Sequence, residues 1–181
     1  MTESVDRVQK VLIIDDNDDL RELQKLLLKP TYSVETAECG MSGLETLDHS
    51  TDVVLLDRNM PGLSGTETAV AIRESEYNPA VAIVSANPAD TDIFKIPCDA
   101  YLEKPVKQPD LISTVEELLS RALHDSTLRE FLALESKHRA LRKSTFGNCH
   151  TDEFKESVRK LKSLEKQLAG NAVTGNSAVS D

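Results

Sequence analysis

The sequence predicts an α/β domain, a doubly wound parallel sheet with helices on both faces, followed by a C-terminal α-helical hairpin. Short apolar runs alternate with longer amphipathic stretches through residues 10–123. Strands that are apolar on both faces occur in parallel sheets covered by helices on both sides. Two further amphipathic stretches follow without an apolar strand between them, which predicts helices alone.

Five strand–helix units are expected in the first domain, residues 1–123. The apolar runs of strand length lie at 10–16, 32–37, 52–57, 80–86 and 98–105. The helical patterns that follow them lie at 18–30, 40–48, 64–75, 89–95 and 108–123. The first helix places Leu20, Leu23 and Leu27 on one face. The fourth is expected to be short or irregular, because Pro88 and Pro97 flank it.

The helical hairpin, called the arm below, is expected over residues 124–168. Its first helix carries apolar residues at helical spacing, and a second stripe follows a Gly-Asn turn. The two stripes consist of Leu128, Phe131, Leu134 and Leu141, then Phe154, Val158, Leu161, Leu164 and Leu168. Residues 169–181 are small and polar, which predicts a disordered tail.

Charge is distributed unevenly along the chain. Residues 1–123 hold 11 Lys and Arg against 23 Asp and Glu, a net charge of −12. The arm holds 10 against 7, a net charge of +3, and Asp181 in the tail brings the whole chain to −10. The acidic first domain argues against nucleic-acid binding there, whereas the mildly basic arm stays eligible.

No membrane or secretory segment is predicted. The start of the chain is polar, and the first apolar run, 11–14, is far shorter than the ~18–20 residues of a membrane span. We therefore expect a cytoplasmic protein that does not contact a membrane. Cys39, Cys98 and Cys149 are widely spaced and form no CxxC pair, which predicts reduced cysteines rather than disulfides or a zinc site.

Polar residues stand where four of the expected strands end. Asp15 and Asp16 end the first strand, Asp57 the third and Ser85 the fourth, and Lys104 follows the fifth. The carboxyl ends of parallel strands meet at one rim, which is where ligands of open α/β sheets bind. The sequence therefore predicts that these five side chains converge.

The combination favours phosphoryl transfer. Neighbouring carboxylates stay ionised together only beside a cation, and an all-oxygen site suits Mg²⁺ with several of its waters kept. Lys104 adds a positive charge and Ser85 a hydroxyl donor, both suited to a phosphoryl group whose charge is spread over its oxygens. Asp57 is then placed as a nucleophile that accepts the group.

Plainer and competing interpretations exist. A single acid at a strand end is more often a turn or helix-capping residue, so the hypothesis depends on the whole set. A different enzyme class is a haloacid-dehalogenase-type phosphatase, since Asp16 and Asp18 form a D-x-D after an apolar strand. Such enzymes need a later acidic pair, and no G-D-x-x-x-D pattern follows Lys104. Phosphorylation of Asp16 would favour the phosphatase, and phosphorylation of Asp57 a switch that is not itself an enzyme.

Four segments resemble the response-regulator receiver domain of two-component signalling. They are "VLIIDD" (11–16), "VVLLDRNMPGLSG" (53–65), "AIVSA" (82–86) and "YLEKPV" (101–106), in the family's order. The resemblance covers about two thirds of the chain and implies a flavodoxin-like, five-stranded fold. It also implies a phosphorelay in which a sensor histidine kinase supplies the phosphoryl group to Asp57.

The resemblance implies further roles at the site. Asp15, Asp16 and Asp57 would hold Mg²⁺ together with the backbone carbonyl of Asn59, with Asp16 the favoured direct ligand. Lys104 would pair with the phosphoryl oxygens, before a Pro105 whose peptide bond is often cis in this family.

Ser85 and Tyr101 resemble the family's switch residues. The resemblance implies that Ser85 moves toward the phosphoryl group and that Tyr101 swings inward behind it, which changes the face formed by the fourth helix, the fifth strand and the fifth helix.

The arm resembles the HalX domain that follows the receiver in haloarchaeal regulators. That resemblance implies a regulator of transcription whose output biochemistry is open. Dimerisation or packing is favoured over DNA binding for the arm, because a net charge of +3 is a small electrostatic footprint and no helix-turn-helix is legible. Three outputs therefore stay open: a homodimer through the C-terminal helices, a DNA contact, or an adaptor without DNA binding. A long basic stripe on the second arm helix would favour the transcriptional output.

Overall fold

The five predicted strands form one parallel sheet in the order β2-β1-β3-β4-β5. The computed structural model describes residues 7–121, 124–144 and 151–175, with side chains up to residue 169. The strands are β1 (Lys10–Ile14), β2 (Ser33–Ala37), β3 (Thr51–Asp57), β4 (Ala80–Ser85) and β5 (Ala100–Glu103). Because β1, β3 and β4 lie inside the sheet, their side chains are buried on both faces, as their unbroken apolar runs predict.

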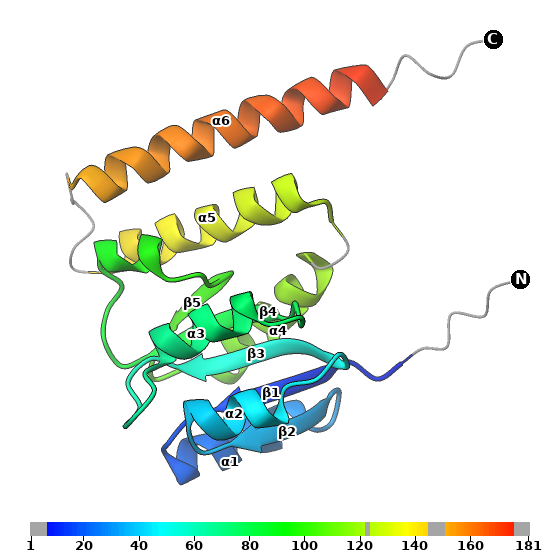
Figure 1. Cartoon of the computed structure of the whole chain (residues 1–181), viewed down its shortest axis with the longest axis vertical. Helices are drawn as coiled ribbons and strands as arrows, with labels where there is room; N and C mark the ends of the chain where they lie inside the picture. Colours follow the sequence, from blue (N-terminus) through cyan, green and yellow to red (C-terminus); the bar gives the residue numbers. More distant parts are fainter. Residues whose placement is uncertain (1–6, 122–123, 145–150, 176–181) are drawn as a thin grey trace, which may run out of the picture.

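Helices cover both faces of the sheet (Figure 1). The helices α1 (Asp18–Leu28) and α4 (Gln108–Arg121) border one apolar core. The helices α2 (Gly40–Thr46) and α3 (Gly65–Glu74), with the 3₁₀ helix η1 (Thr91–Lys95), border the other. The α/β prediction of a doubly wound parallel sheet is confirmed.

The first helix departs from its predicted packing. Leu23 was expected on the buried face, yet it is 51% exposed, and Leu26 is 60% exposed. The buried residues of α1 are Gln24 and Leu28. The contact of α1 with the sheet is therefore narrow, and periodicity alone could not tell which of the closely spaced leucines faces inward.

The segment between β4 and β5 is short, as its prolines predict. Only η1 forms there, with Asp90 as its N-cap accepting a hydrogen bond from Asp92 N, and Ile93 is fully buried. This leaves room on that side of the sheet, next to the edge strand β5.

The arm fills that room. Its helices α5 (Ser126–Lys143) and α6 (Asp152–Gly175) run side by side in opposite directions and stack beyond β5 (Figure 1). Helix α5 contacts β5, η1 and α4, and α6 contacts η1. Helix α6 continues to Gly175, beyond the expected boundary at 168, and the expected tail from 176 onward lies outside the described residues. The Gly-Asn turn and Cys149 also lie outside them.

The contact between η1 and the arm is aromatic at its centre. Phe94 of η1, His138 of α5 and Phe154 of α6 lie with ring centroids 4.9–6.3 Å apart. The hydroxyl of Ser157 lies 2.7 Å from Phe154 O and shares a 3.1 Å hydrogen bond with His138 Nε2. Lys95 pairs with Glu153 at 3.2 Å on the outside of this cluster.

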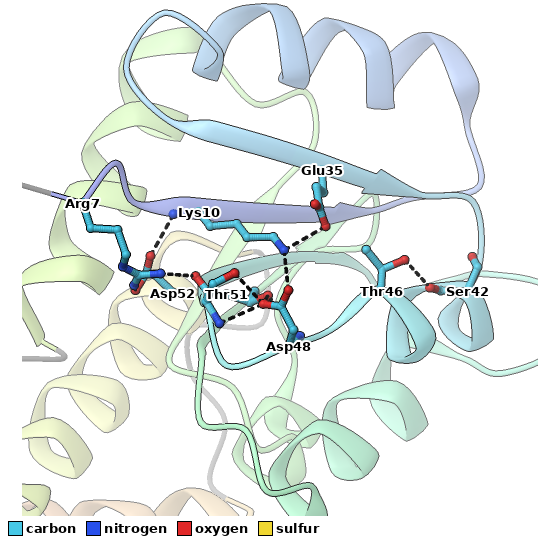
Figure 2. A network of polar contacts seen from close by, with 9 residues as sticks. Arg7, Lys10, Glu35, Ser42, Thr46, Asp48, Thr51 and Asp52 are labelled. Carbon is cyan, nitrogen blue, oxygen red and sulfur yellow. Dashed lines mark hydrogen bonds and ion pairs between the residues drawn. The ribbon is translucent and has the colours of Figure 1, made fainter.

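At the amino ends of the strands, a polar network joins β1 to its neighbours (Figure 2). Lys10 Nζ lies 3.0 Å from Glu35 of β2 and 2.9 Å from Asp48. The backbone N–H of Lys10 donates to Asp52, which Arg7 also contacts. This network fixes the end of the sheet that lies opposite the candidate site.

None of the helices in the described part of the chain combines the length and apolar character that a membrane crossing requires.

Candidate functional site

Four of the five predicted site residues stand at the carboxyl ends of neighbouring strands. Asp15 directly follows β1, Asp57 ends β3, Ser85 ends β4 and Lys104 directly follows β5. Asp57 is paired with Val84 and Ser85 with Glu103 across the parallel ladders, so the ends lie level. The sheet therefore brings these side chains to one rim.

Lys104 lies between the carboxylates of Asp15 and Asp57. Its ammonium nitrogen is 2.8 Å from Asp15 Oδ2 and 2.5 Å from Asp57 Oδ1. The side chains of Asp15 and Asp57 are only 2% and 7% exposed, and that of Lys104 is 15% exposed. Two nearly buried carboxylates thus share one cation, which offsets the repulsion between them.

The remaining carboxylate oxygens are oriented by the backbone. Asp15 Oδ1 accepts from Asn17 N at 2.9 Å, and Asp57 Oδ2 accepts from Asn59 N at 2.8 Å. Both are hydrogen bonds to the residue two positions ahead, the local geometry that Asp favours at strand ends. Asp15 and Asp57 therefore do act as turn residues. The same hydrogen bonds hold their carboxylates in place at the site.

Burial alone lowers the pKa of Lys104, but the hydrogen bonds and negative charges of Asp15 and Asp57 outweigh it, so the pKa lies above its usual value. The ammonium is therefore charged throughout the physiological pH range. A fixed positive charge beside a carboxylate is what stabilises incoming anionic oxygens.

Asp16 does not join this cluster. It is exposed, whereas its neighbour Asp15 is buried. Within the described ranges, no three acidic, His or Cys side chains come close enough together to hold a metal on their own. The two buried carboxylates still fit Mg²⁺, which is commonly bound by one or two carboxylates plus substrate phosphate and keeps its other waters.

Ser85 and Tyr101 lie next to the rim. Ser85 is fully buried, and its hydroxyl oxygen accepts from Asn87 N at 3.1 Å. Tyr101 is 7% exposed, and its hydroxyl donates to Asn87 O at 2.9 Å. Both predicted switch residues therefore contact the same loop residue, Asn87.

Tyr101 also lies beneath the arm. It lines a groove of about 300 Å³ between β5, α4 and α5. Ala140 of α5 packs against the apolar core to which Tyr101 belongs. The side chain predicted to switch is therefore close to the helix predicted to carry the output.

Sequence reasoning missed three supporting residues. Arg58 Nη1 lies 3.5 Å from the Tyr101 hydroxyl, and Arg21 Nη1 donates to Asp15 O at 2.6 Å. Gly65 opens α3 against the backbone of Asp57 and Arg58, and its N–H donates to Arg58 O at 3.0 Å. The only sequence signal for Gly65 was its place directly after the N-cap Ser64.

The geometry agrees with comparisons to known proteins. The family model of the response regulator receiver domain matches residues 11–116 of this chain. The chain belongs to this receiver family. The receiver has the flavodoxin-like fold that the resemblance implied, and its Lys104–Pro105 peptide bond is cis. Helices α5 and α6 are additions beyond the matched range.

Its relatives include regulators of transcription. A candidate transcriptional regulator of the haloarchaeon Haloferax volcanii is 45% identical over 134 residues, 74% of this chain and 23% of that protein. The receiver domain of a Clostridium thermocellum response regulator is 32% identical with a TM-score of 0.58, over 64% of this chain and 97% of that chain. The Thermotoga maritima response regulator TrrA, solved in complex with Mg²⁺–BeF, is 31% identical with a TM-score of 0.55, over 61% and 99%.

The receiver is common to these proteins, and the match to the Haloferax protein, over 134 residues, is longer than the matched receiver range 11–116. The chain spans 23% to 54% of the length of the first curated relatives that it matches. The match to the Haloferax protein agrees with the predicted haloarchaeal relationship.

Proposed function

We propose that this receiver accepts a phosphoryl group on Asp57 from a phosphohistidine of a sensor histidine kinase, and that phosphorylation changes the contacts of the arm. The observation that carries the proposal is the ammonium of Lys104 between the nearly buried carboxylates of Asp15 and Asp57. Such an arrangement offers a carboxylate nucleophile and a positive charge for the phosphoryl oxygens in one water-poor site.

In this reaction an Asp57 oxygen attacks the phosphorus, the P–N bond of the phosphohistidine breaks, and the imidazole nitrogen keeps the electron pair. Lys104 is positioned to stay with the oxygens as their charge develops. The hydroxyl of Ser85 accepts one hydrogen bond in the present arrangement and keeps its own proton to donate. The new anionic oxygens would draw that proton and so pull on the loop at Asn87.

Asp15 and Asp57, with Asp16 and the carbonyl of Asn59 as further oxygen donors, would hold Mg²⁺. The ion would supply positive charge against the phosphoryl oxygens when bound. Both oxygens of Asp15 are engaged by Lys104 and Asn17 N, whereas Asp16 is exposed beside it, so Asp16 stays the proposed direct ligand.

The test is the mass of the intact protein after incubation with acetyl phosphate and Mg²⁺. We expect the wild type to gain one phosphoryl group and Asp57→Asn to gain none. The exposed Asp19 provides the matched control, Asp19→Asn, which should gain the group normally. Borohydride trapping followed by peptide mass spectrometry would then locate the label.

A label that persists in Asp57→Asn and maps to Asp16 would overturn the switch and favour the haloacid-dehalogenase-type phosphatase. Failure to label the wild type under these conditions would also count against the proposed chemistry. Apart from its own dephosphorylation, we propose no enzymatic activity toward other substrates.

We further propose that the arm is a HalX-type output segment. Phosphorylation at Asp57 would reach it through Asn87 and Tyr101, because α5 forms one wall of the groove that Tyr101 lines. Helices α5 and α6 already contact each other; α5 also contacts β5, and both contact η1. A homodimer through these helices would have to compete with that packing, so the arrangement does not support it.

A DNA-contacting output is favoured by one specific observation. Lys155, Arg159, Lys162 and Lys166 recur at steps of four, three and four residues, and all are exposed on α6. They form a basic stripe on the side of α6 that faces away from α5 and the receiver. A basic stripe on the second arm helix is the feature expected above to favour a transcriptional output. It suits contact with a phosphate backbone.

The contact is tested with the full chain and a duplex of random sequence, by fluorescence anisotropy at several salt concentrations. Removing Arg159 and Lys162 as a Gln double variant should weaken binding and lower the slope of log K against log salt by up to about 1.8. The control replaces the exposed Lys29 and Lys107 in the same way and should leave the slope unchanged. Equal slopes, or no binding at low salt, would instead favour an adaptor without DNA binding.

A further inference from the structure

A cavity lies between the receiver and the arm, away from the site at Asp57. It has a volume of about 780 Å³, within the range of about 300–1,000 Å³ that is typical of small-molecule sites. Its walls come from η1, the loop before β5, α5 and α6, with Arg73 of α3 and Asn78 at the side. The apolar part of the lining consists of Phe94, Pro97, Cys98, Ala133 and Leu134.

Lys137 of α5 brings a buried charge to this cavity. The residue is only 8% exposed, and its ammonium donates to the carbonyl oxygen of Ile96 at 2.6 Å. An ammonium has three donors, and this is the one hydrogen bond found for it in the described part of the chain. No carboxylate of the described residues lies within ion-pair distance of it. Buried charges are usually paired, so this one is poorly compensated.

Most other charges around the cavity are already matched. Three cations of the lining each contact an acid of the lining at 2.5–3.2 Å, namely Arg73 with Asp99, Lys95 with Glu153 and Lys160 with Glu130. The unpaired charges that remain among the described lining residues are Lys137, Arg129 and the exposed Glu156. The interior of the cavity therefore has a local excess of positive charge at Lys137.

We propose that this cavity binds a small organic monoanion, with its carboxylate on the ammonium of Lys137 and a flat apolar body against Phe94, Ala133 and Leu134. A single carboxylate matches Lys137, the one buried cation of the described lining without an ion pair, whereas the unpaired Arg129 is only partly buried. A polyanion such as a nucleotide is disfavoured, because four acids lie around the same cavity.

The position of the cavity gives the ligand a structural effect. Phe94 and Cys98 belong to the receiver, whereas Ala133 and Lys137 belong to the arm. A ligand that needs both walls binds only while the arm is docked, so it stabilises the docked arrangement by mass action. The proposal does not depend on the chemistry of Asp57, and its experiment requires no phosphorylation.

The probes are 1-naphthoate and its neutral analogue 1-naphthamide, titrated into the full chain by calorimetry with amide chemical shifts as a second readout. We expect naphthoate to bind at least about tenfold more tightly than the amide, because a charged hydrogen bond is stronger than a neutral one. Shifts should concentrate in η1 and around Ala133. Absence of naphthoate binding at millimolar concentration, or equal affinity for the two probes, would overturn the proposal.

Two variants test the placement. Lys137→Met keeps the length of the side chain and removes the charge, and should weaken naphthoate binding by about tenfold or more while leaving the amide unaffected. The control Lys143→Met changes an exposed lysine of the same helix outside the cavity and should bind as the wild type does. Naphthoate binding that is unchanged in Lys137→Met would contradict the assigned anion position.

Ala133→Leu keeps the assignment testable if Lys137→Met undocks the arm. It leaves Lys137 in place and adds volume to the cavity wall, and it should reduce the affinity for both probes. Binding of both probes at wild-type strength would show that they sit elsewhere. Circular dichroism and thermal unfolding of each variant would establish that the fold is kept.

Discussion

Gly65 lies directly against the backbone of Asp57. A Cβ placed on Gly65 would overlap with the Asp57 carbonyl oxygen, and it would come within 2.8 Å of Arg58 Cα and 2.9 Å of the Asp57 carbonyl carbon. All of these are backbone atoms, which cannot yield by a side-chain rotation. The first residue of α3 is therefore restricted to glycine by the closeness of the strand end that carries the proposed phosphoryl acceptor.

We expect Gly65→Ala to move the end of β3 or the start of α3, lowering the free energy of unfolding by about 1–3 kcal/mol and slowing phosphorylation of Asp57. The measurement is chemical denaturation together with the rate of labelling by acetyl phosphate. Gly62→Ala is the control, since Gly62 has a φ of 76° and open space around its Cα. It should lose about 1 kcal/mol from backbone strain alone and keep its labelling rate. Equal labelling in both variants would contradict this account.

Replacing Lys104 with Met should leave two nearly buried carboxylates without their shared cation. We expect a loss of about 3 kcal/mol in unfolding free energy at neutral pH and a labelling rate lower by about 100-fold. The control is Lys107→Met at an exposed site three residues further on, and wild-type stability in Lys104→Met would refute the bridging role.

The same ion pair predicts a loss of wild-type stability in alkali. The pKa of Lys104 is raised above its ordinary value of 10.5, so its contribution is complete below that value and disappears as the pH rises through the raised pKa. Denaturant midpoints measured across this range should fall further for the wild type than for Lys104→Met. Parallel curves would argue against the pair.

Tyr101→Phe removes the hydroxyl that donates to Asn87 O and keeps the ring. We expect a loss of about 1 kcal/mol and faster amide exchange in the loop between β4 and η1. Tyr77→Phe is the matched control, because the Tyr77 hydroxyl makes no hydrogen bond within the described residues. If exchange in that loop is the same in both variants, the hydroxyl does not hold it.

The docking of the arm should weaken in mild acid. Burial, with a smaller contribution from Arg142, lowers the pKa of His138, while Glu135 acts in the opposite direction. A lowered pKa gives stability that is present above the ordinary His value of about 6.5 and is lost as the pH falls through the folded value. Contact signals between Phe94 and Phe154 should therefore decline as the pH falls below about 6.5.

Variants at His138 and at His49 separate this effect from general acid sensitivity. His138→Gln can still donate to Ser157 and does not titrate, so its docking should vary less over this range. His49→Gln changes an exposed histidine on the receiver and should behave as the wild type does. An unchanged pH profile in His138→Gln would exclude His138 as the cause.

Much of the site could be predicted because strand ends obey simple geometry. An apolar run that stops at an acid shows where a buried parallel strand ends, and parallel strands end at one rim. That logic found Asp15, Asp57, Ser85 and Lys104. The same logic could not predict that Asp15 is buried and Asp16 exposed. Beyond the last backbone hydrogen bond of the strand, the direction of each side chain depends on the loop.

The docking of the arm was not predictable from pattern alone. An amphipathic stripe shows that a helix buries one face, but not which surface covers it. Lys137 shows the same limit, since a lysine in such a helix is expected to be exposed and here it reaches Ile96 O. Leu23 shows the converse, because α1 carries more leucines than its narrow contact with the sheet can bury.

The short η1 has a consequence for how this chain can recombine with others. Phe94 and the carbonyl of Ile96 belong to the receiver by sequence, yet their partners His138, Phe154 and Lys137 come from the arm. A genetic exchange at the junction near residue 123 would separate these partners. The segment from η1 through α6 is therefore expected to be inherited as one block, with substitutions on the two sides of the junction occurring together.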